Sequence, residues 1–160
     1  MNVAALLERA RAAGIRIATA ESCTGGMVIA ALTDIAGASD VVERGFVTYS
    51  NTAKREMLGV RAATLDAHGA VSEQVAREMA EGALARSDAQ LAVAITGIAG
   101  PGGSEHKPEG RVCFGLAASG RATITETIEF GPMGRQNVRL AARDHALGLL
   151  QRAVLQSGEE

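Results

Sequence analysis

Apolar residues recur along the chain with two different spacings, which distinguish predicted helices from predicted strands. Val3, Leu6, Leu7 and Ala10 lie three or four positions apart, as they do on the buried face of an amphipathic helix. Residues 91–95 form an uninterrupted apolar run, as expected of a strand covered on both faces. The same patterns predict further helices over residues 24–32, 51–58, 73–84 and 135–155, and strands over residues 15–19, 45–49, 111–118 and 122–130.

The order of these elements is typical of an α/β fold. Helices alternate with strands in the first half of the chain, and the Ser-Gly pair at residues 119–120 predicts the turn of a β-hairpin. The order α-β-α-β-α-α-β-β-β-α therefore predicts a three-layer α/β/α sandwich with a mixed central sheet of about five strands. Because 47% of the 160 residues are hydrophobic, we expect a single domain over residues 1–160 with one well-buried core.

Charge and composition disfavour several classes of function. The chain has 16 basic and 18 acidic residues, a net charge of −2 and 2% aromatic residues, and it contains no basic run. Nucleic-acid binding through a charged face or a stacking platform is therefore disfavoured. No run of about 18 apolar residues is present to span a bilayer, and charged residues come too early for a signal peptide. We expect a cytoplasmic protein that does not bind membranes.

The cysteines and histidines predict no metal site and no disulfide framework. Cys23 and Cys113 are not part of a C-x-x-C motif, and we expect both to be reduced thiols. His68, His106 and His145 lack the spacing of metal ligands. We therefore expect the protein to use neither a metal nor another cofactor.

The segment A-E-S-C-T-G-G at residues 20–26 joins a predicted strand to a predicted helix. Such a turn points backbone N–H groups outward at the positive end of a helix dipole, where they can bind an anion. Ser22 adds a hydroxyl group and Cys23 a thiol, while Gly25 and Gly26 let a ligand approach the backbone closely. A helix capped by Ser or Thr and packed through small residues explains the same segment without any catalysis.

A second candidate is the glycine-rich loop at residues 96–110, which follows the buried strand. The loop lacks the G-x-G-x-x-G pattern of dinucleotide-binding proteins, and Ser104 stands where a P-loop has lysine. In an open α/β sheet, ligands bind at the carboxyl ends of the strands, which is where this loop begins. The alternative is an ordinary surface loop.

Basic side chains near these segments complete the candidate chemistry. Lys54 follows Tyr49 by five residues, and burial would let it act as a general base for a serine, with Tyr49 assisting proton transfer. An isolated lysine is more commonly a solvated surface charge. Arg135, Arg139 and Arg143 repeat every four residues and repel one another unless a bound anion or nearby carboxylates neutralise them. A bound anion would make Arg135 and Arg139 a phosphate or carboxylate clamp.

Four motifs together resemble the C-terminal domain of the CinA family, the nicotinamide mononucleotide deamidases. They are T-A-E-S-C-T-G-G at 19–26, F-V-T-Y-S-N-T-A-K at 46–54, H-G-A-V-S-E at 68–73, and T-G-I-A-G-P-G-G-S with K-P-E-G at 96–110. The motifs span most of the chain in the order found in the family. The resemblance implies hydrolysis of the carboxamide of nicotinamide mononucleotide to nicotinate mononucleotide and ammonia, without a cofactor.

The resemblance also implies roles for individual residues. Ser22 is expected to be the nucleophile and Lys54 its general base, with Tyr49 close by. Backbone N–H groups in the turn after Ser22 would hold either the oxyanion or the phosphate. The residues expected to bind the substrate are Thr24, Gly25, Gly26, Thr96, Gly97, Arg135 and Arg139.

Two features depart from the family's pattern. The loop at 100–110 is slightly shorter, and F-G-P-M-G-R at 130–135 replaces F-x-G-D-R, so that the Asp before Arg135 is missing. The larger family members carry an N-terminal domain, whose activities are not expected of this chain.

Two other functional hypotheses and one expectation about assembly remain. Cys23 would be an alternative nucleophile, because a helix N-terminus lowers the pKa of a thiol. A module that binds a nucleotide or a protein partner without catalysis would have the same fold. From the resemblance and the Ala- and Val-rich helices we expect a homodimer or a higher homo-oligomer.

Overall fold

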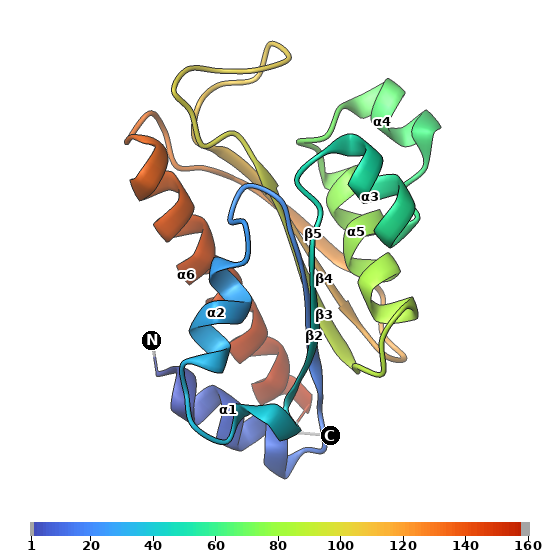
Figure 1. Cartoon of the computed structure of the whole chain (residues 1–160), viewed down its shortest axis with the longest axis vertical. Helices are drawn as coiled ribbons and strands as arrows, with labels where there is room; N and C mark the ends of the chain where they lie inside the picture. The colour runs from blue at the N-terminus through green and yellow to red at the C-terminus, as the bar shows by residue number, and fades with distance from the viewer. Residues whose placement is uncertain (1, 158–160) are drawn as a thin grey trace.

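The β-sheet at the centre of the protein has five strands in the order β2-β1-β3-β4-β5 (Figure 1). The structure is a computed structural model and describes residues 2–157. The strands are β1 (Ile17–Glu21), β2 (Val42–Val47), β3 (Leu91–Gly97), β4 (Arg111–Ala118) and β5 (Ile124–Glu129). Strand β1 pairs in parallel with β2 and β3, whereas β4 pairs antiparallel with β3 and β5, so the sheet is mixed.

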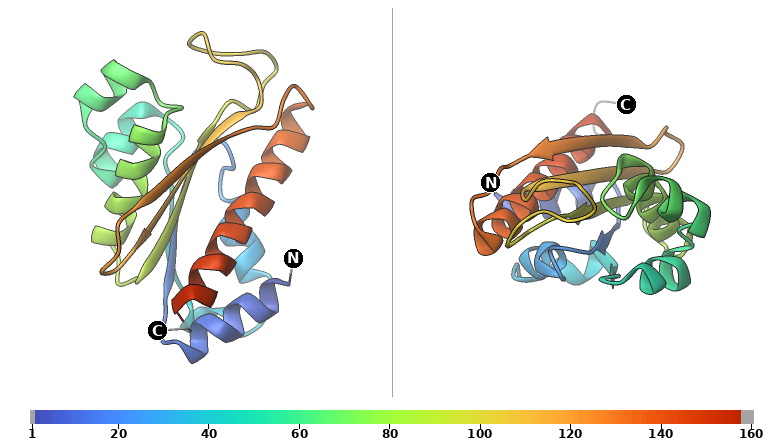
Figure 2. Two further views of the ribbon diagram at one scale, coloured as in Figure 1. Left: turned by 180° about the vertical axis from the view of Figure 1, so that it is seen from behind. Right: turned by 90° about the horizontal axis from the view of Figure 1, so that it is seen from above.

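Helices cover both faces of this sheet, as Figures 1 and 2 show. One face carries α1 (Val3–Ala12), α2 (Met27–Thr33) and α6 (Arg135–Ser157). The other carries α3 (Asn51–Leu58), α4 (Ala62–His68) and α5 (Glu73–Ala85). A short 3-10 helix, η1 (Ala38–Asp40), precedes β2. The predicted three-layer α/β/α sandwich with a five-stranded mixed sheet is therefore confirmed.

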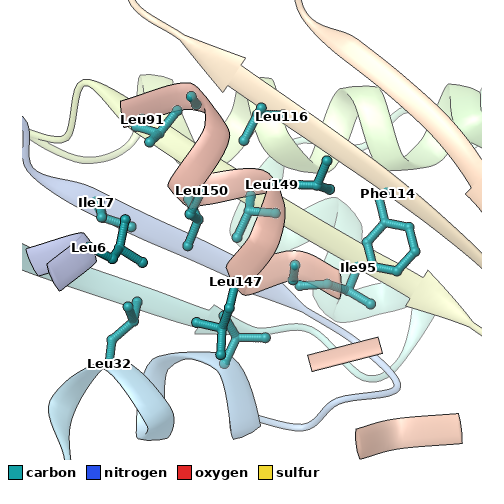
Figure 3. Packing of buried hydrophobic residues seen from close by; sticks show 14 of the residues in the cluster. Leu6, Ile17, Leu32, Leu91, Ile95, Phe114, Leu116, Leu147, Leu149 and Leu150 are labelled. Atoms are coloured by element: carbon teal, nitrogen blue, oxygen red, sulfur yellow. The ribbon is translucent and has the colours of Figure 1, made fainter. Parts of the chain in front are cut away.

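The two faces of the sheet differ in the size of their side chains. In β3, Leu91, Val93 and Ile95 pack in the apolar cluster beside α6, part of which Figure 3 shows. The alternating Ala92 and Ala94 pack in the cluster on the α5 side. Because alanine is short, helix α5 lies close to the sheet and apolar burial on this face depends on tight packing.

Glycines permit the closest approaches on the α5 side. A Cβ atom at Gly115 of β4 would lie 2.4 Å from the backbone oxygen of Ala76 in α5. A Cβ atom at Gly82 of α5 would lie 2.0 Å from the backbone oxygen of Leu58, the last residue of α3. Helix α3 therefore rests directly on α5, which fixes its position relative to the sheet.

Several element boundaries differ from the sequence prediction, and those of β1, α2 and β2 bear on the site. Strand β1 begins at Ile17 rather than residue 15, because the Ile15 amide closes the end of α1 by donating to the Ala10 carbonyl (2.8 Å). Helix α2 begins at Met27 rather than residue 24, since Gly25 and Gly26 have positive φ angles. Strand β2 covers Val42–Val47 rather than residues 45–49.

Helix α4 (Ala62–His68) was not predicted. It is seven residues long and buries only Thr64 and Leu65, too few positions to produce a periodic apolar pattern.

The carboxyl ends of the parallel strands meet at one edge of the sheet. Ser22 follows β1, Thr48 and Tyr49 follow β2, and the loop after Gly97 follows β3. In Figure 1 this loop, drawn in yellow, extends beyond the upper edge of the sheet. Three of the motifs found in the sequence are therefore brought to the same edge, where α/β sheets bind their ligands.

Candidate active site

The side chains of Ser22 and Lys54 meet at this edge of the sheet. Lys54 lies in the first turns of α3, and its Nζ donates a hydrogen bond to Ser22 Oγ at 2.9 Å. Both side chains are buried, since Ser22 is 8% and Lys54 1% exposed. A hydroxyl and an amine in hydrogen-bond contact are a nucleophile and a base in the arrangement that covalent catalysis requires.

The surroundings of Lys54 favour its neutral form. Burial lowers the pKa of the Lys54 ammonium group to about 8, and among residues 2–157 no carboxylate pairs with it. Its other hydrogen bonds go to the backbone oxygens of Thr48 (2.8 Å) and Tyr49 (3.3 Å). In the neutral amine these two carbonyls hold the two N–H hydrogens, so the lone pair is directed at Ser22 Oγ.

The backbone around Ser22 is fixed by the two neighbouring strands. The Ser22 amide donates to the Ile95 carbonyl of β3 at 3.0 Å, and the Thr48 amide donates to the Glu21 carbonyl at 2.8 Å. The Gly25 amide donates to the Ser22 carbonyl at 3.0 Å, which closes the turn. Ser22 therefore sits on a rigid support, as precise catalytic geometry demands.

The N-terminus of α2 is already occupied by Glu21, a residue to which sequence reasoning assigned no role. The fully buried Glu21 carboxylate accepts hydrogen bonds from Thr24 Oγ1 (2.7 Å) and the amides of Val28 (2.9 Å) and Ile29 (3.1 Å). The expectation that the amides of the turn point outward unpaired is wrong for Gly25, which donates to the Ser22 carbonyl, and Glu21 takes two amides of α2 that an anion would otherwise bind. An acidic residue shortly before a predicted helix start was the signal available in the sequence.

Burial also changes the chemistry of Cys23. The thiol is 6% exposed, and burial raises its pKa to about 11. The expected lowering of this pKa by the helix N-terminus is wrong, because burial outweighs the groups that would stabilise a thiolate. At neutral pH Cys23 is thus a protonated thiol and a poor nucleophile.

Two adjoining cavities open beside the Ser22–Lys54 pair. The inner cavity has a volume of about 200 Å³, and the outer one, of about 340 Å³, lies along the glycine-rich loop. The inner cavity is lined by Ser22, Cys23, Tyr49, Asn51, Lys54, Ala70, Val71, Thr96, Gly97, Ala99 and Arg135. Tyr49, Gly97 and Arg135 line both cavities, so a ligand of nucleotide size can extend from one into the other.

Arg135 bridges the passage between the two cavities. One guanidinium nitrogen donates to Tyr49 Oη (2.9 Å) and another to the Gly100 carbonyl (2.8 Å). Among residues 2–157 no carboxylate pairs with Arg135, so its charge is available to an anionic ligand. Tyr49 and Gly100 support the guanidinium in this chain, which lacks the Asp of the F-x-G-D-R pattern.

Four predicted substrate-binding residues do not line either cavity: Thr24, Gly25, Gly26 and Arg139. Arg139 turns instead to the turn after β1, where its Nε donates to the Cys23 carbonyl (2.9 Å) and its Nη2 to the Thr24 carbonyl (3.4 Å). Arg143 pairs with Asp144 at 2.9 Å. Each of the three arginines of α6 thus has its own hydrogen-bond acceptors, which relieves the predicted repulsion between them.

Thr96 and Gly97 stand where the sequence placed them, at the floor of the inner cavity. The Thr96 hydroxyl donates to the Ala70 carbonyl at 2.8 Å and so joins β3 to the segment before α5. Asn51, Ala70 and Val71 also line this cavity and were not predicted. Their spacing gives no signal, but all three lie within the motifs at 46–54 and 68–73 that carry the family resemblance.

Within residues 2–157 there is no group of three or more His, Cys, Asp and Glu side chains that could hold a metal ion. No helix in this part of the chain is both long enough and apolar enough to cross a membrane.

Comparison with known proteins connects this site to a family. The model of the CinA C-terminal domain matches residues 2–154. The nicotinamide-nucleotide amidohydrolase PncC of Escherichia coli K12 is 53% identical over 148 residues, which cover 92% of this chain and 89% of that protein. A CinA-like protein of Mycolicibacterium vanbaalenii is 52% identical over 147 residues, 91% of this chain. The match covers 35% of that relative, so the chain spans about a third of the length of the CinA-like proteins.

Solved structures show the same fold. The competence/damage inducible protein CihA from Agrobacterium tumefaciens superposes with a TM-score of 0.91 at 49% identity, over 95% of this chain and 92% of that one. A CinA superfamily protein from Escherichia coli gives a TM-score of 0.89 at 40% identity, over 93% and 87% of the two chains. From its motifs, its fold and these matches, the chain belongs to the CinA C-terminal domain family.

Proposed function

We propose that this chain hydrolyses the carboxamide of nicotinamide mononucleotide to nicotinate mononucleotide and ammonia. The observation that carries the proposal is the buried 2.9 Å contact between Lys54 Nζ and Ser22 Oγ beside two adjoining cavities that together have room for a nucleotide. The relatives called nicotinamide-nucleotide amidohydrolase, 53% identical over most of the chain, support the choice of substrate.

The first half of the reaction is acyl transfer to Ser22. Neutral Lys54 takes the proton from Ser22 Oγ while the oxygen attacks the carboxamide carbon, which forms a tetrahedral intermediate. The Lys54 ammonium then returns this proton to the amide nitrogen, and the C–N bond breaks to release ammonia. Nicotinate mononucleotide remains attached to Ser22 as an ester, and Lys54 is neutral again.

Water completes the second half by the same route. Lys54 accepts a proton from a water molecule as the water oxygen attacks the ester carbonyl, and it then protonates Ser22 Oγ as the ester bond breaks. The products are nicotinate mononucleotide and free Ser22, so each turnover consumes one water and needs no cofactor.

Arg135 is the residue we assign to the substrate's phosphate. Its guanidinium lines both cavities and has no carboxylate partner in the described part of the chain, and planar guanidinium groups bind phosphate through paired hydrogen bonds. Thr96 and Gly97 line the nucleotide site. The Tyr49 hydroxyl, which accepts a hydrogen bond from Arg135, is a further polar group at this site.

We also propose a cytoplasmic homodimer. Both cysteines are free and buried, which suits a reducing compartment. The edge strand β2 and the adjacent α3 leave Val47 44% and Met57 41% exposed, and a second copy would cover such apolar groups. Light scattering at low protein concentration decides between a dimer and a monomer.

Substitution of either member of the proposed catalytic pair should abolish ammonia release. We expect Ser22→Ala and Lys54→Met each to lower kcat by roughly 10⁴-fold or more, because neither acylation nor deacylation can proceed without both groups. A coupled ammonia assay measures the rate, and thermal unfolding checks that the variants fold. The control Cys23→Ala should keep its activity. A fully active Ser22→Ala, or wild-type protein that binds the nucleotide without releasing ammonia, would contradict the proposal.

The rate should rise with pH through the pKa of Lys54. Protonated Lys54 donates all three of its hydrogens and cannot accept one from Ser22, whereas the neutral amine above a pKa of about 8 can. We expect kcat/KM to increase along a single limb with a midpoint near that pKa, as measured by initial rates between about pH 6 and pH 9. A rate that is flat or falls over this range would argue against a lysine base.

Arg135→Gln should remove the preference for the phosphorylated substrate. We expect the KM for nicotinamide mononucleotide to rise roughly 10- to 100-fold, because a charge-assisted contact with phosphate is lost. The rate with nicotinamide riboside, which has no phosphate, should stay close to that of the wild type. An equal loss with both substrates would show that Arg135 does not bind the phosphate.

A further inference from the structure

Arg139 makes an unusual contact with the turn that carries Ser22. The residue lies on α6, 116 positions away from Cys23, and reaches the turn from the α6 side of the sheet. Its Nε donates to the Cys23 carbonyl at 2.9 Å and its Nη2 to the Thr24 carbonyl at 3.4 Å. Lys54 approaches the same turn from α3, on the opposite face of the sheet.

The rest of the turn is held by other groups. The Thr24 carbonyl also accepts from the Met27 amide at 3.0 Å, so it is the Cys23 carbonyl that depends on Arg139. Strands β2 and β3 hold the backbone on either side of the Glu21–Ser22 bond, and the Gly25 amide holds the Ser22 carbonyl. The Glu21 carboxylate holds the first amides of α2. Among residues 2–157, Arg139 is the side chain that donates to the carbonyls of Cys23 and Thr24.

The Cys23 carbonyl needs a partner because its residue is buried. Cys23 is 6% exposed, so water cannot readily replace the guanidinium at this carbonyl. A buried carbonyl without a donor costs about 1–3 kcal/mol, and the peptide planes of the turn would rotate to avoid that cost. Because Ser22 immediately precedes Cys23, such a rotation moves Ser22 Oγ relative to Lys54 Nζ.

The absence of a side chain at Gly25 leaves space for the Arg139 guanidinium. Gly25 has a φ angle of +56°, and a Cβ atom there would lie 3.2 Å from Arg139 Nη2. The guanidinium group also reaches both carbonyls at once, which the single ammonium group of a lysine does less well.

We propose that Arg139 is a positioning residue, which holds Ser22 in line with Lys54 through the carbonyls of Cys23 and Thr24 and does not bind the substrate's phosphate. The proposal rests on Ser22 and Lys54 being the catalytic pair. It separates two arginines that are one helical turn apart: Arg135 faces the cavities, and Arg139 faces the nucleophile's backbone.

The kinetic test compares three variants on two substrates. With Arg139→Gln we expect kcat to fall roughly 10- to 100-fold, by the same factor for nicotinamide mononucleotide and nicotinamide riboside, with both KM values unchanged. Arg139→Lys should recover part of the loss. Arg143→Gln, a matched control one turn further along α6 whose partner is Asp144, should behave as the wild type. A rise in KM confined to the mononucleotide, or an unchanged kcat, would overturn the proposal.

A second readout does not depend on the natural substrate. Phenylmethanesulfonyl fluoride carries no phosphate and modifies a serine when Oγ attacks sulfur, fluoride leaves and the base takes the hydroxyl proton. We expect Arg139→Gln to slow the labelling of Ser22, measured by mass spectrometry, while Arg143→Gln labels at the wild-type rate. Guanidinium ion at a concentration that does not unfold the protein should restore labelling of Arg139→Ala.

The two readouts separate the failure of this proposal from that of the proposed function. Slower labelling of Arg139→Gln in a protein that releases no ammonia would support the positioning role and refute the deamidase assignment. Equal labelling of Arg139→Gln and wild type would overturn the positioning role alone. If Arg139→Gln and Arg139→Ala both lost cooperative unfolding and guanidinium ion rescued neither, the role of Arg139 would be purely structural and the proposal would be wrong.

Discussion

The site depends on one constraint, which is that the buried amine of Lys54 has no counter-charge among residues 2–157. Taking an ammonium group out of water is costly, so burial favours the neutral amine and brings its pKa down to about 8. A carboxylate partner would stabilise the charged form and remove the base. The acceptors beside Lys54 are instead two backbone carbonyls and a hydroxyl, which hold the amine in place and carry no charge.

The fold supplies this constraint through close packing on one face of the sheet. Lys54 and Leu58 lie four positions apart on the buried side of α3, and Gly82 lets the end of that helix rest on α5. The alanines of β1 and β3 let α5 in turn approach the sheet. Small residues between α3 and α5 and between α5 and the sheet therefore set the position of the Lys54 amine.

Much of the fold could be predicted from the sequence, because the information lies in local periodicity. The strand at 91–95 and the long C-terminal helix are both strongly patterned and were found close to their observed positions. Helix α4 was missed since it buries too few residues, and the start of α2 was misplaced because two glycines with positive φ precede it. The partnership of Ser22 and Lys54 came from a resemblance to a family, since spacing along the chain does not reveal a contact between distant residues.

The site residues show where sequence reasoning stops. The four-residue repeat of arginines correctly places them on one side of α6, but it does not reveal that Arg139 meets backbone carbonyls while Arg135 faces a cavity. The pKa of Cys23 was predicted to move in the wrong direction, because the prediction required an exposed thiol and the packing around the turn buries it. In both cases the outcome depends on surroundings that distant parts of the chain supply, and the local sequence does not show them.

The most direct measurement of the central claim is the titration of the Lys54 side chain itself. The chain contains two lysines, Lys54 and Lys107, so the spectrum of protein labelled with ¹³C at lysine Cε has two signals, and Lys54→Met identifies one of them. We expect the Lys54 signal to titrate with a pKa of about 8, which leaves roughly one amine in ten neutral at pH 7. A value at the ordinary lysine pKa of about 10.4 would leave fewer than about one in a thousand neutral, and Lys54 would not be the base.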